Sequence, residues 1–448
     1  MLHNKKGSAL IAVYFIITIL VLFSASIFMR VIAEKSVFES RRNNMYAFYL
    51  AEAGAGTAMQ WLRAQASPPV TANYANPVYA PPPINYPANP ALNLVAGSAL
   101  VSIYADRNNP NNIINRYLIF SLAVTQDANG QITCSRQIVK EIQEESFAKY
   151  SYFSDDEHQL VWWWQRPVWF TSGSFLEGPV HTNSHYHISG DPIFDGPVSS
   201  TDNFIDYMNG GPPADNPDFR QGVTLGVPAI PVGNLNETNV KQAALSPNGL
   251  LLDGDSTVQF VSDGTMNVTN ANRNCLAQNM PIPANGALYV DNGDLDVSGT
   301  LNGRMTAGTE ENLIISDNIL YETDPMADPT SDDMIGLVSG RDVIVSSNAP
   351  FDLSIFATIA ATGVSTATGG DGSFTVESYW QGPPKGLLMI YGGLMQIRRG
   401  AVGTFNSATN QQVSGYDKDY HYDPRCRYSP PNWFPKTQDY ELVSSIGR

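Results

Sequence analysis

The sequence predicts an α+β protein that is mostly β: a long N-terminal helix, a small antiparallel sheet and a large parallel β-solenoid. Three observations predict this fold. Residues 8–29 form an uncharged apolar stretch, and no proline or glycine occurs between Ser8 and Ala53. Alternating strand patterns separated by turns follow this helix. Beyond about Phe147, short strand motifs recur at fixed offsets. A β-sandwich is the alternative fold for this last part.

The apolar stretch is long enough to cross a membrane. A spanning helix needs about 20 apolar residues, and 22 are available before Arg30. A cleavable signal peptide has a shorter apolar region of about 7 to 15 residues, although Ser24-Ala25-Ser26 offers small residues for cleavage. A plain anchor leaves Lys5-Lys6-Gly7 unexplained. A dimerising helix would need a small-xxx-small seam, which is poorly developed here.

The helical pattern continues beyond the membrane segment. Apolar residues recur at helical spacing as far as about Arg63, namely Val31, Ile32, Val37, Phe38, Met45, Phe48, Tyr49 and Ala53. Residues 8–66 are therefore predicted to form one helix with a transmembrane half at 8–29, a rod of about 80 Å. Its outer half needs an apolar partner, and clean coiled-coil heptads are absent.

The N-terminal segment resembles that of type IV pilin-like proteins, in particular the PilX-type minor pilins. The matching features are a short basic leader that ends at Gly7, the small residue Ser8, and the apolar helix after it. The run Ala47-Phe48-Tyr49-Leu50-Ala51-Glu52-Ala53-Gly54 is similar to that family's AF-x-x-AEAG signature. The resemblance extends from Met1 to about Gln65.

This resemblance implies processing and assembly. Residues 1–7 would be a leader peptide that a prepilin peptidase removes after Gly7, and Ser8 would become the methylated N-terminus. Other pilin-like subunits would bind the N-terminal helix, after the chain has been inserted in the bacterial inner membrane. Major pilins carry a glutamate where this chain has Ala12. We therefore expect a minor subunit, and the tip, priming and decorating roles stay open.

The charge balance describes an acidic ectodomain. The formal net charge is -16, while residues 1–66 carry seven Lys or Arg against three Glu and so contribute +4, which leaves -20 for the remainder. Such a domain repels phosphate backbones. The only compact basic group there is Arg398-Arg399. We therefore expect no nucleic-acid partner, and an ectodomain outside the cytoplasm and then at the cell surface.

Two segments connect the helix to the repeats. Residues 67–91 are rich in proline and are predicted to form an extended linker. Residues 92–146 hold three alternating runs separated by turn-like sequences, the second of which ends in Asn129-Gly130. They are predicted to form a small antiparallel β-meander, which resembles the sheet that packs on the pilin helix.

Residues 147–415 contain the repeats. Gly178-Pro179-Val180 recurs at 196–198. Asp294-Leu295-Asp296-Val297-Ser298 recurs in altered form at 312–316, which is the same offset, and once more at 342–346, which is a longer one. Short strands at such offsets predict stacked rungs of a parallel solenoid. Residues 416–448, which are aromatic and proline-rich, are predicted to cap it.

A second resemblance covers most of the chain from about residue 150. The sequence is similar to an uncharacterised family of long bacterial pilin-like proteins. The motifs that carry this similarity are Gly178-Pro179-Val180-His181-Thr182-Asn183, Gly190-Asp191-Pro192-Ile193-Phe194, Gly196-Pro197-Val198, Gly415-Tyr416-Asp417-Lys418-Asp419-Tyr420, Tyr422-Asp423-Pro424-Arg425 and Pro430-Pro431. These motifs imply a surface location but no chemistry.

Few residues suggest a metal site. His181, His185 and His187 are separated by even numbers of residues, so on one strand their side chains would lie on the same face. Asp191 follows them, and zinc could bind such a set of ligands. Turn-like residues at Thr182-Asn183 and at 190–192 would break that face, so turn and rung roles are the default.

Residues 291–296 place acidic side chains around a glycine, as calcium loops do, but lack the EF-hand glutamate. A β-turn is favoured there, and we predict no metal and no cofactor.

The remaining features point to a structural role rather than an enzyme. Trp162, Trp163, Trp164 and Trp169 could stack on a surface glycan or pack against the body of the protein. The three cysteines, Cys134, Cys275 and Cys426, give no disulfide framework, and one long-range bridge stays open. No nucleophile elbow, phosphate loop or zincin motif is present. We expect a pilus or secretion-filament subunit. A membrane-anchored protein that binds or cleaves polysaccharide through the solenoid is the alternative.

Overall fold

The structure is a computed structural model of the chain. It describes residues 5–65, 68–69, 71, 73–89, 95–106, 115–161, 164–272, 275–363 and 371–447. The chain divides into two compact units. The first comprises residues 1–110, 115–143 and 440–448, and the second comprises residues 111–114 and 144–439.

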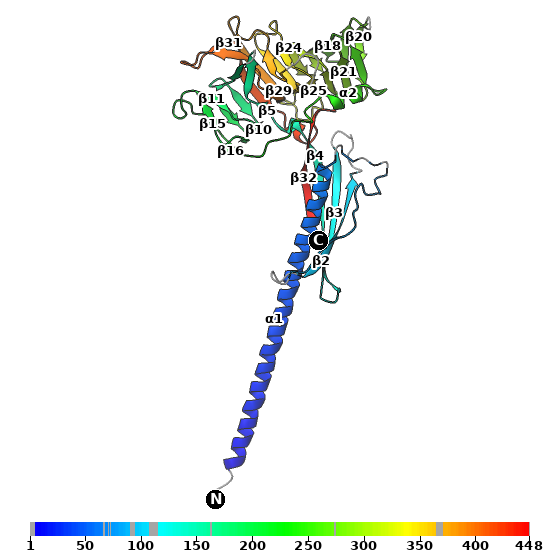
Figure 1. Cartoon of the computed structure of the whole chain (residues 1–448), viewed down its shortest axis with the longest axis vertical. Helices are drawn as coiled ribbons and strands as arrows, with labels where there is room; N and C mark the ends of the chain where they lie inside the picture. The colour runs from blue at the N-terminus through cyan, green and yellow to red at the C-terminus, as the bar shows by residue number, and fades with distance from the viewer. Residues whose placement is uncertain are drawn as a thin grey trace. The chain divides into compact units, whose positions relative to one another are not determined.

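The N-terminal helix α1 runs without a break from Lys5 to Arg63, a span of 59 residues. At 1.5 Å per residue it is about 88 Å long, and the predicted end at Arg63 is confirmed. Figure 1 shows that only its C-terminal part lies along the sheet of the first unit. The apolar part has a mean hydropathy of 2.7 in its best window, none of which is buried, so α1 can cross a membrane by length and composition.

The sheet of the first unit has the order β1-β2-β3-β4-β32. Its strands are β1 (Ile84–Tyr86), β2 (Ala96–Ala105), β3 (Arg116–Gln126), β4 (Ile132–Ser146) and β32 (Lys436–Gly447). β1, β2, β3 and β4 pair antiparallel in sequence order. Asp127 accepts hydrogen bonds from the backbone of Asn129 and Gln131 at 2.9 Å, and Gly130 has a φ of 79°. This turn confirms the predicted meander, whereas 107–110 of the other predicted turn lie outside the described residues.

The proline-rich segment is attached to the edge of this sheet. β1 lies within it, and Tyr79 forms an isolated antiparallel bridge with Ile103. The ring of Tyr79 stacks on Trp61 of α1, with 4.2 Å between the ring centroids. An edge strand tolerates proline because one side of it makes no ladder bonds. The segment predicted as a linker therefore contributes an edge strand in its described part.

In the second unit, the repeated motifs pair with one another as parallel strands. β10 (Val180–Thr182) pairs with β13 (Val198–Ser200) in the register Val180↔Val198. β22 (Leu295–Leu301) pairs with β24 (Leu313–Tyr321), which pairs with β26 (Val343–Val345). In each pair the register equals the offset at which the motif recurs in the sequence. The prediction that the repeated motifs lie side by side as parallel strands is confirmed at these strands.

Most of the other strands of the second unit are short, although β27, β29 and β31 are longer, and most also pair in parallel. They are β5 (Tyr152–Asp156), β6 (His158–Val161), β7 (Trp164–Pro167), β8 (Phe170–Thr171), β9 (Phe175–Glu177), β11 (His187–Ser189), β12 (Ile193–Asp195), β14 (Asp206–Tyr207), β15 (Asp218–Phe219), β16 (Val223–Leu225), β17 (Leu250–Asp253), β18 (Ser256–Val261), β19 (Thr265–Asn270), β20 (Cys275–Pro281), β21 (Ala287–Asp291), β23 (Arg304–Thr309), β25 (Met334–Ser339), β27 (Leu353–Ala361), β28 (Phe374–Val376), β29 (Pro384–Arg398), β30 (Gly403–Phe405) and β31 (Gln412–Tyr422). The unit also holds the helix α2 (Thr238–Ala244) and the 3-10 turns η2 (Phe147–Lys149) and η3 (Pro424–Arg427).

The large sheet is mixed rather than wholly parallel. β18, β19 and β20 form an antiparallel excursion, and β30 pairs antiparallel with β31. The fold is therefore a long apolar helix followed by mostly β structure with mixed sheets. A regular parallel solenoid over 147–415 is not established. The parallel pairing of most neighbouring strands also differs from a β-sandwich, whose sheets are antiparallel.

The residues predicted as a cap extend from the second unit into the first. β31 pairs in parallel with β29 and β9. Arg304 then binds Asn432 at 3.1 Å, and Trp433 donates to the carbonyl of Asn285 at 2.8 Å, which attaches the tail to the body of the unit. Beyond this point β32 joins the sheet of the first unit beside β4.

Two cores fill the second unit. The larger lies inside the stacked strands and includes Leu176, Phe194, Leu295 and Ile355, each with 0% exposure. The other packs η2, α2 and the outer side of the strands around Phe147, Phe153 and Tyr289. Burial on both sides explains why β25 and β27 are almost continuously apolar rather than alternating.

Candidate functional site

The Ala51-Glu52-Ala53-Gly54 motif lies where α1 packs on the sheet of the first unit. Ala51 is fully buried, and Glu52 forms an ion pair with Lys140 of β4 at 2.6 Å. A Cβ atom on Gly54 would lie 2.5 Å from Ser121 Oγ of β3, closer than real Cβ contacts. The motif therefore permits a close approach of helix to sheet and fixes it with one ion pair.

The rest of α1 presents apolar side chains that the described residues of the first unit leave uncovered. In the apolar N-terminal part, Leu10, Phe15, Leu22 and Phe28 are each more than 60% exposed. Beyond it, Phe38, Met45 and Tyr49 are 66%, 57% and 60% exposed. Gly7 and Ser8 lie within the first turns of the helix. Cleavage between them stays a prediction.

The basic pair Arg398-Arg399 does not form a surface patch. Arg399 is 1% exposed and its guanidinium binds the carboxylate of Glu157 at 2.6 Å. Arg398 lies near Asp156 and Asp371, at 4.0 and 3.8 Å. Both charges are balanced by carboxylates, so this pair offers no phosphate site. No local pattern in the sequence indicates this pairing, because Glu157 lies 242 residues from Arg399.

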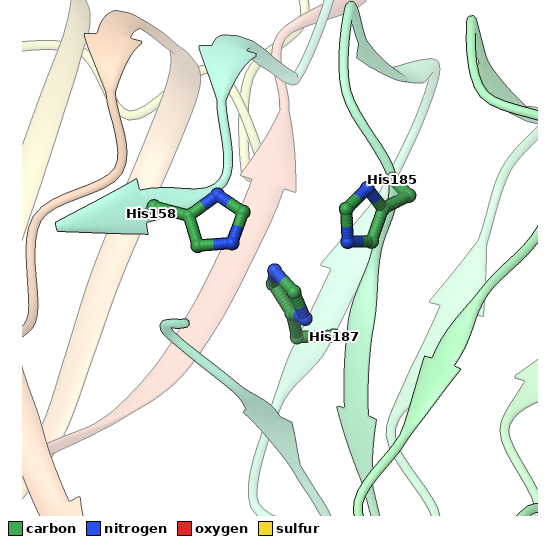
Figure 2. A group of neighbouring side chains, drawn as sticks. All are labelled: His158, His185 and His187. Atoms are coloured by element: carbon green, nitrogen blue, oxygen red, sulfur yellow. The ribbon is translucent and has the colours of Figure 1, made fainter. Parts of the chain in front are cut away.

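Three histidines converge in the second unit, but they are not the three that the sequence grouped. His185 precedes β11, His187 begins it, and His158 begins β6. A ring nitrogen of each lies within 4.8 Å of those of the other two. Figure 2 shows the three rings around a common space, each with one nitrogen directed into it.

His181 lies apart from this cluster. Its Nδ1 is 2.8 Å from Ser199 Oγ and its Nε2 is 3.0 Å from Asn183 Oδ1. The predicted turn at 182–183 does break the shared face, because β10 ends at Thr182 and β11 begins at His187. Asp191 is exposed and accepts a hydrogen bond from the backbone of Asn216 at 3.3 Å. The structural role favoured for these two residues agrees with these contacts.

Each histidine of the cluster is held by an aspartate. The Nδ1 of His158 is 2.8 Å from Asp156, that of His185 is 2.9 Å from Asp202, and that of His187 is 3.0 Å from Asp206. An ionised carboxylate only accepts hydrogen bonds, so each Nδ1–H is the donor. In a neutral imidazole held in this way, the Nε2 atom carries the free lone pair.

His187 is the most enclosed member of the cluster. Its side chain is 3% exposed, against 22% for His158 and 18% for His185. Burial lowers the pKa of His187 to about 4, although the hydrogen bond to Asp206 opposes the shift. The imidazole is therefore neutral at neutral pH. Its Nε2 is buried and has no hydrogen-bond partner among the described residues.

The acidic loop at 291–296 is held by the chain's own donors. Asp291 forms an ion pair with Lys241 at 2.7 Å, and Asn292 has a φ of 54°. Asp294 accepts a hydrogen bond from the backbone of Asn312 at 2.9 Å. Residues 292–294 connect β21 to β22, where the sequence favoured a β-turn over a calcium loop.

The aromatic group and the cysteines are only partly described. Trp162 and Trp163 lie outside the described residues, while Trp164 on β7 is 66% exposed. The glycan partner stays a prediction.

Cys134 and Cys426 are free. Burial raises the pKa of the Cys426 thiol to about 12. The side chain of Cys275 lies outside the description.

Lys418 of β31 lines a cavity of about 200 Å³ together with Trp169 and Tyr416. Burial, and after it the nearby Arg399, lowers the pKa of the Lys418 amine to about 7, although Asp417 and Glu157 oppose the shift. At Lys149, burial also lowers the pKa, but Tyr150 and Glu145 raise it more, and it lies above its ordinary value.

We therefore expect Lys418 to react with acetic anhydride faster than Lys149 at neutral pH. Only the neutral amine is a nucleophile, so the acetylation rate of Lys418 should rise about tenfold per pH unit below pH 7 and level off above it. The rate at Lys149 should continue to rise beyond pH 9. Peptide mass spectrometry after short pulses measures both residues in one sample. Parallel pH profiles for the two lysines would contradict the assignment.

Comparisons with known proteins identify little. Residues 114–202 match a domain family of unknown function, DUF4900. This range contains all three histidines of the cluster. No curated protein matches the sequence. Two solved chains match. One is the crystal structure of the competence-associated pilin ComZ from Thermus thermophilus, with 10% identity, coverage of 90% of this chain and 97% of that chain, and a TM-score of 0.33. A TM-score this low does not establish that the two chains share a fold.

Proposed function

We propose that this protein is a structural subunit of a type IV pilus or a related secretion filament. The observation that carries the proposal is α1, an unbroken helix of 59 residues whose N-terminal part is apolar and exposed and whose C-terminal part packs on an antiparallel sheet. A helix of this kind can reside in the membrane and then pack among other helices, since both environments cover apolar side chains.

The finer assignment is a minor pilin or pseudopilin of the PilX type. The leader that ends at Gly7 and the Ala51-Glu52-Ala53-Gly54 motif support it, and Ala12 supports a minor rather than a repeated subunit. The contacts of Gly54 and Glu52 give the motif a physical role in joining helix to sheet. The exposed Phe38, Met45 and Tyr49 are the surface that we assign to neighbouring subunits.

The second unit is the part that the filament displays outside the cell. Its parallel rungs, which pair in the register of the sequence repeats, support a solenoid-like body. Its acidic charge keeps it soluble. We assign it no enzymatic activity. Before assembly the chain is inserted in the inner membrane through residues 8–29, with the sheet of the first unit and the whole second unit on the extracytoplasmic side.

Removal of the leader tests the proposal most directly. The full chain, expressed with an active prepilin peptidase, should lose residues 1–7 and carry one methyl group on Ser8, as measured by intact mass. Gly7→Leu should retain the whole leader in the same cells, because the resemblance implies cleavage directly after this glycine. A catalytically inactive peptidase gives the matching control.

Two outcomes would overturn the proposal. Retention of residues 1–7 beside an active peptidase that processes a known pilin would leave α1 as a plain anchor. Cleavage near Ser26 would instead identify a secreted protein. Pull-down of co-expressed pilins by the full chain, lost when Phe38 and Tyr49 are changed to serine, would separately test the assembly surface.

A further inference from the structure

The aspartates that bind the histidine cluster define which nitrogen atoms are free. Asp156 at the end of β5, Asp202 after β13 and Asp206 on β14 each bind an Nδ1 atom. Carboxylates in this position fix the tautomer and orientation of histidines that ligate metals, and they raise the basicity of the free nitrogen. This arrangement occurs three times in the one cluster.

The free nitrogen atoms converge. The three rings contact one another edge to face, with centroid separations of 4.7 Å from His187 to each of the other two rings and 5.7 Å between His158 and His185. Their inward nitrogens lie within 4.8 Å of one another (Figure 2). Three lone pairs directed at one point repel each other unless a proton or a cation lies between them.

The Nε2 of His187 is the second, independent observation. It is buried without a hydrogen-bond partner among the described residues, on a side chain that is 3% exposed. A buried acceptor left without a partner costs free energy because its desolvation is not compensated. Packing alone would favour an apolar residue at this position. A bound cation accounts for a buried imidazole there.

We propose that His158, His185 and His187 bind one divalent transition-metal ion through their Nε2 atoms, with Zn²⁺ as the first choice. Neutral imidazole suits zinc, copper and nickel better than magnesium or calcium. Ligands in a tetrahedral zinc site lie about 2.0–2.1 Å from the ion, and so about 3.4 Å from one another. The ligand nitrogens, which lie within 4.8 Å of one another, would move closer by up to about 1.4 Å when the ion binds.

The site supplies three protein ligands and leaves a fourth position. His158 and His185 are partly exposed, so water or a group from another molecule can complete the coordination. The ion joins the two-stranded sheet β6-β7 to the three-stranded sheet β14-β11-β8. It therefore cross-links two small sheets of the second unit that, in the described part of the chain, share no strand pairing.

The experiment measures zinc bound to the full chain in detergent. After removal of metal with a chelator, equilibrium dialysis against Zn²⁺ followed by elemental analysis should give one tightly bound equivalent per chain. His158→Ala and His187→Ala should each remove it. Asp202→Asn, which leaves all three ligands in place, should weaken binding about 10–100-fold. Zn²⁺ should raise the unfolding temperature of the unchanged protein but not that of His158→Ala.

His421 provides the matched control. Both of its ring nitrogens bind carboxylates, Glu177 at 2.9 Å and Asp419 at 3.1 Å, and it has no place in the cluster. His421→Ala should keep the bound equivalent, as should His181→Ala. Co²⁺ in place of Zn²⁺ should give the visible absorption of a four- or five-coordinate nitrogen site, absent in His158→Ala.

The proposal is overturned if the unchanged protein binds no tight equivalent of Zn²⁺, Ni²⁺ or Cu²⁺. It is equally overturned if the affinity for Zn²⁺ is unchanged in both His158→Ala and Asp202→Asn while these variants remain folded by circular dichroism. Should the buried His187→Ala variant fail to fold, the partly exposed His158 and the carboxylate of Asp202 still decide the result.

Discussion

Replacing Arg399 by alanine is expected to lower the free energy of unfolding of the second unit by about 3–5 kcal/mol. The guanidinium is 1% exposed and binds Glu157, whose side chain is fully buried, at 2.6 Å. Removal of the arginine leaves a buried carboxylate without its counter-charge. Denaturant titration of the full chain in detergent, followed by tryptophan fluorescence, measures the loss, because six of the seven tryptophans belong to residues 144–439.

The surroundings of this ion pair show why the loss cannot be relieved by water. The guanidinium lies 3.4 Å from the centre of the Phe170 ring and donates to the carbonyl of Trp169. Glu157 also accepts hydrogen bonds from Tyr152 and Ser154. Burial, and then the charge of Glu157, raise the pKa of Tyr152 well above its usual value.

Arg398 offers the matched control. It has the same side chain one residue earlier, is 32% exposed, and reaches its carboxylates only at 3.8–4.0 Å. Its replacement by alanine should cost no more than about 1 kcal/mol. The double variant Glu157→Leu with Arg399→Met, which removes both charges, should recover much of the loss. Equal effects of Arg398→Ala and Arg399→Ala would contradict the buried-pair account.

Gly54→Ala is expected to destabilise the first unit by about 1–3 kcal/mol, whereas Gly56→Ala is expected to stabilise it by up to about 1 kcal/mol. Both glycines lie inside α1, so alanine improves helix propensity equally at each. The added Cβ at Gly56 would have no heavy atom within 4 Å, while at Gly54 it would meet Ser121, Val101 and Ala99 at 2.5, 3.0 and 3.1 Å. Hydrogen exchange of the β2 and β3 amides at increasing denaturant, measured by mass spectrometry, distinguishes the two signs.

Ser121 allows this explanation to be tested by rescue. Its Oγ is buried without a hydrogen-bond partner among the described residues. Ser121→Ala should therefore cost little alone, and it should restore part of the stability lost in Gly54→Ala by removing the nearest atom. A Gly54→Ala variant as stable as Gly56→Ala would show that close helix–sheet contact is not what the glycine supplies.

Much of the fold follows from local patterns in the sequence. The helix to Arg63 was predictable because no residue before it interrupts the backbone hydrogen bonds. The parallel pairs at Val180↔Val198 and Leu313↔Val343 were predictable because the motifs repeat at the distance of one rung. The antiparallel excursion of β18, β19 and β20 was not, since its strand pattern resembles that of any rung and only the long-range pairing distinguishes it.

The histidine cluster shows where local reasoning stops. Parity placed His185 and His187 on one face, but it also included His181, because no local rule showed that one strand ends and another begins between them. His158 was missed altogether. The register Tyr152↔Val180 provides the missing signal, since His158 follows Tyr152 at the same spacing as Tyr186 follows Val180. An alignment of the rungs would therefore have placed His158 beside His185 and His187.

The pairing of β32 with β4 imposes an order on biosynthesis. Gln143 and Glu441 bond across these strands although 298 residues separate them. The repeated rungs of the second unit pair with rungs that follow closely in the chain, and these can form as they leave the ribosome. The sheet of the first unit, in contrast, lacks its last strand until residues 436–447 have been translated. Throughout elongation, β4 is an open edge that could pair with other nascent chains, a hazard that the final strand removes.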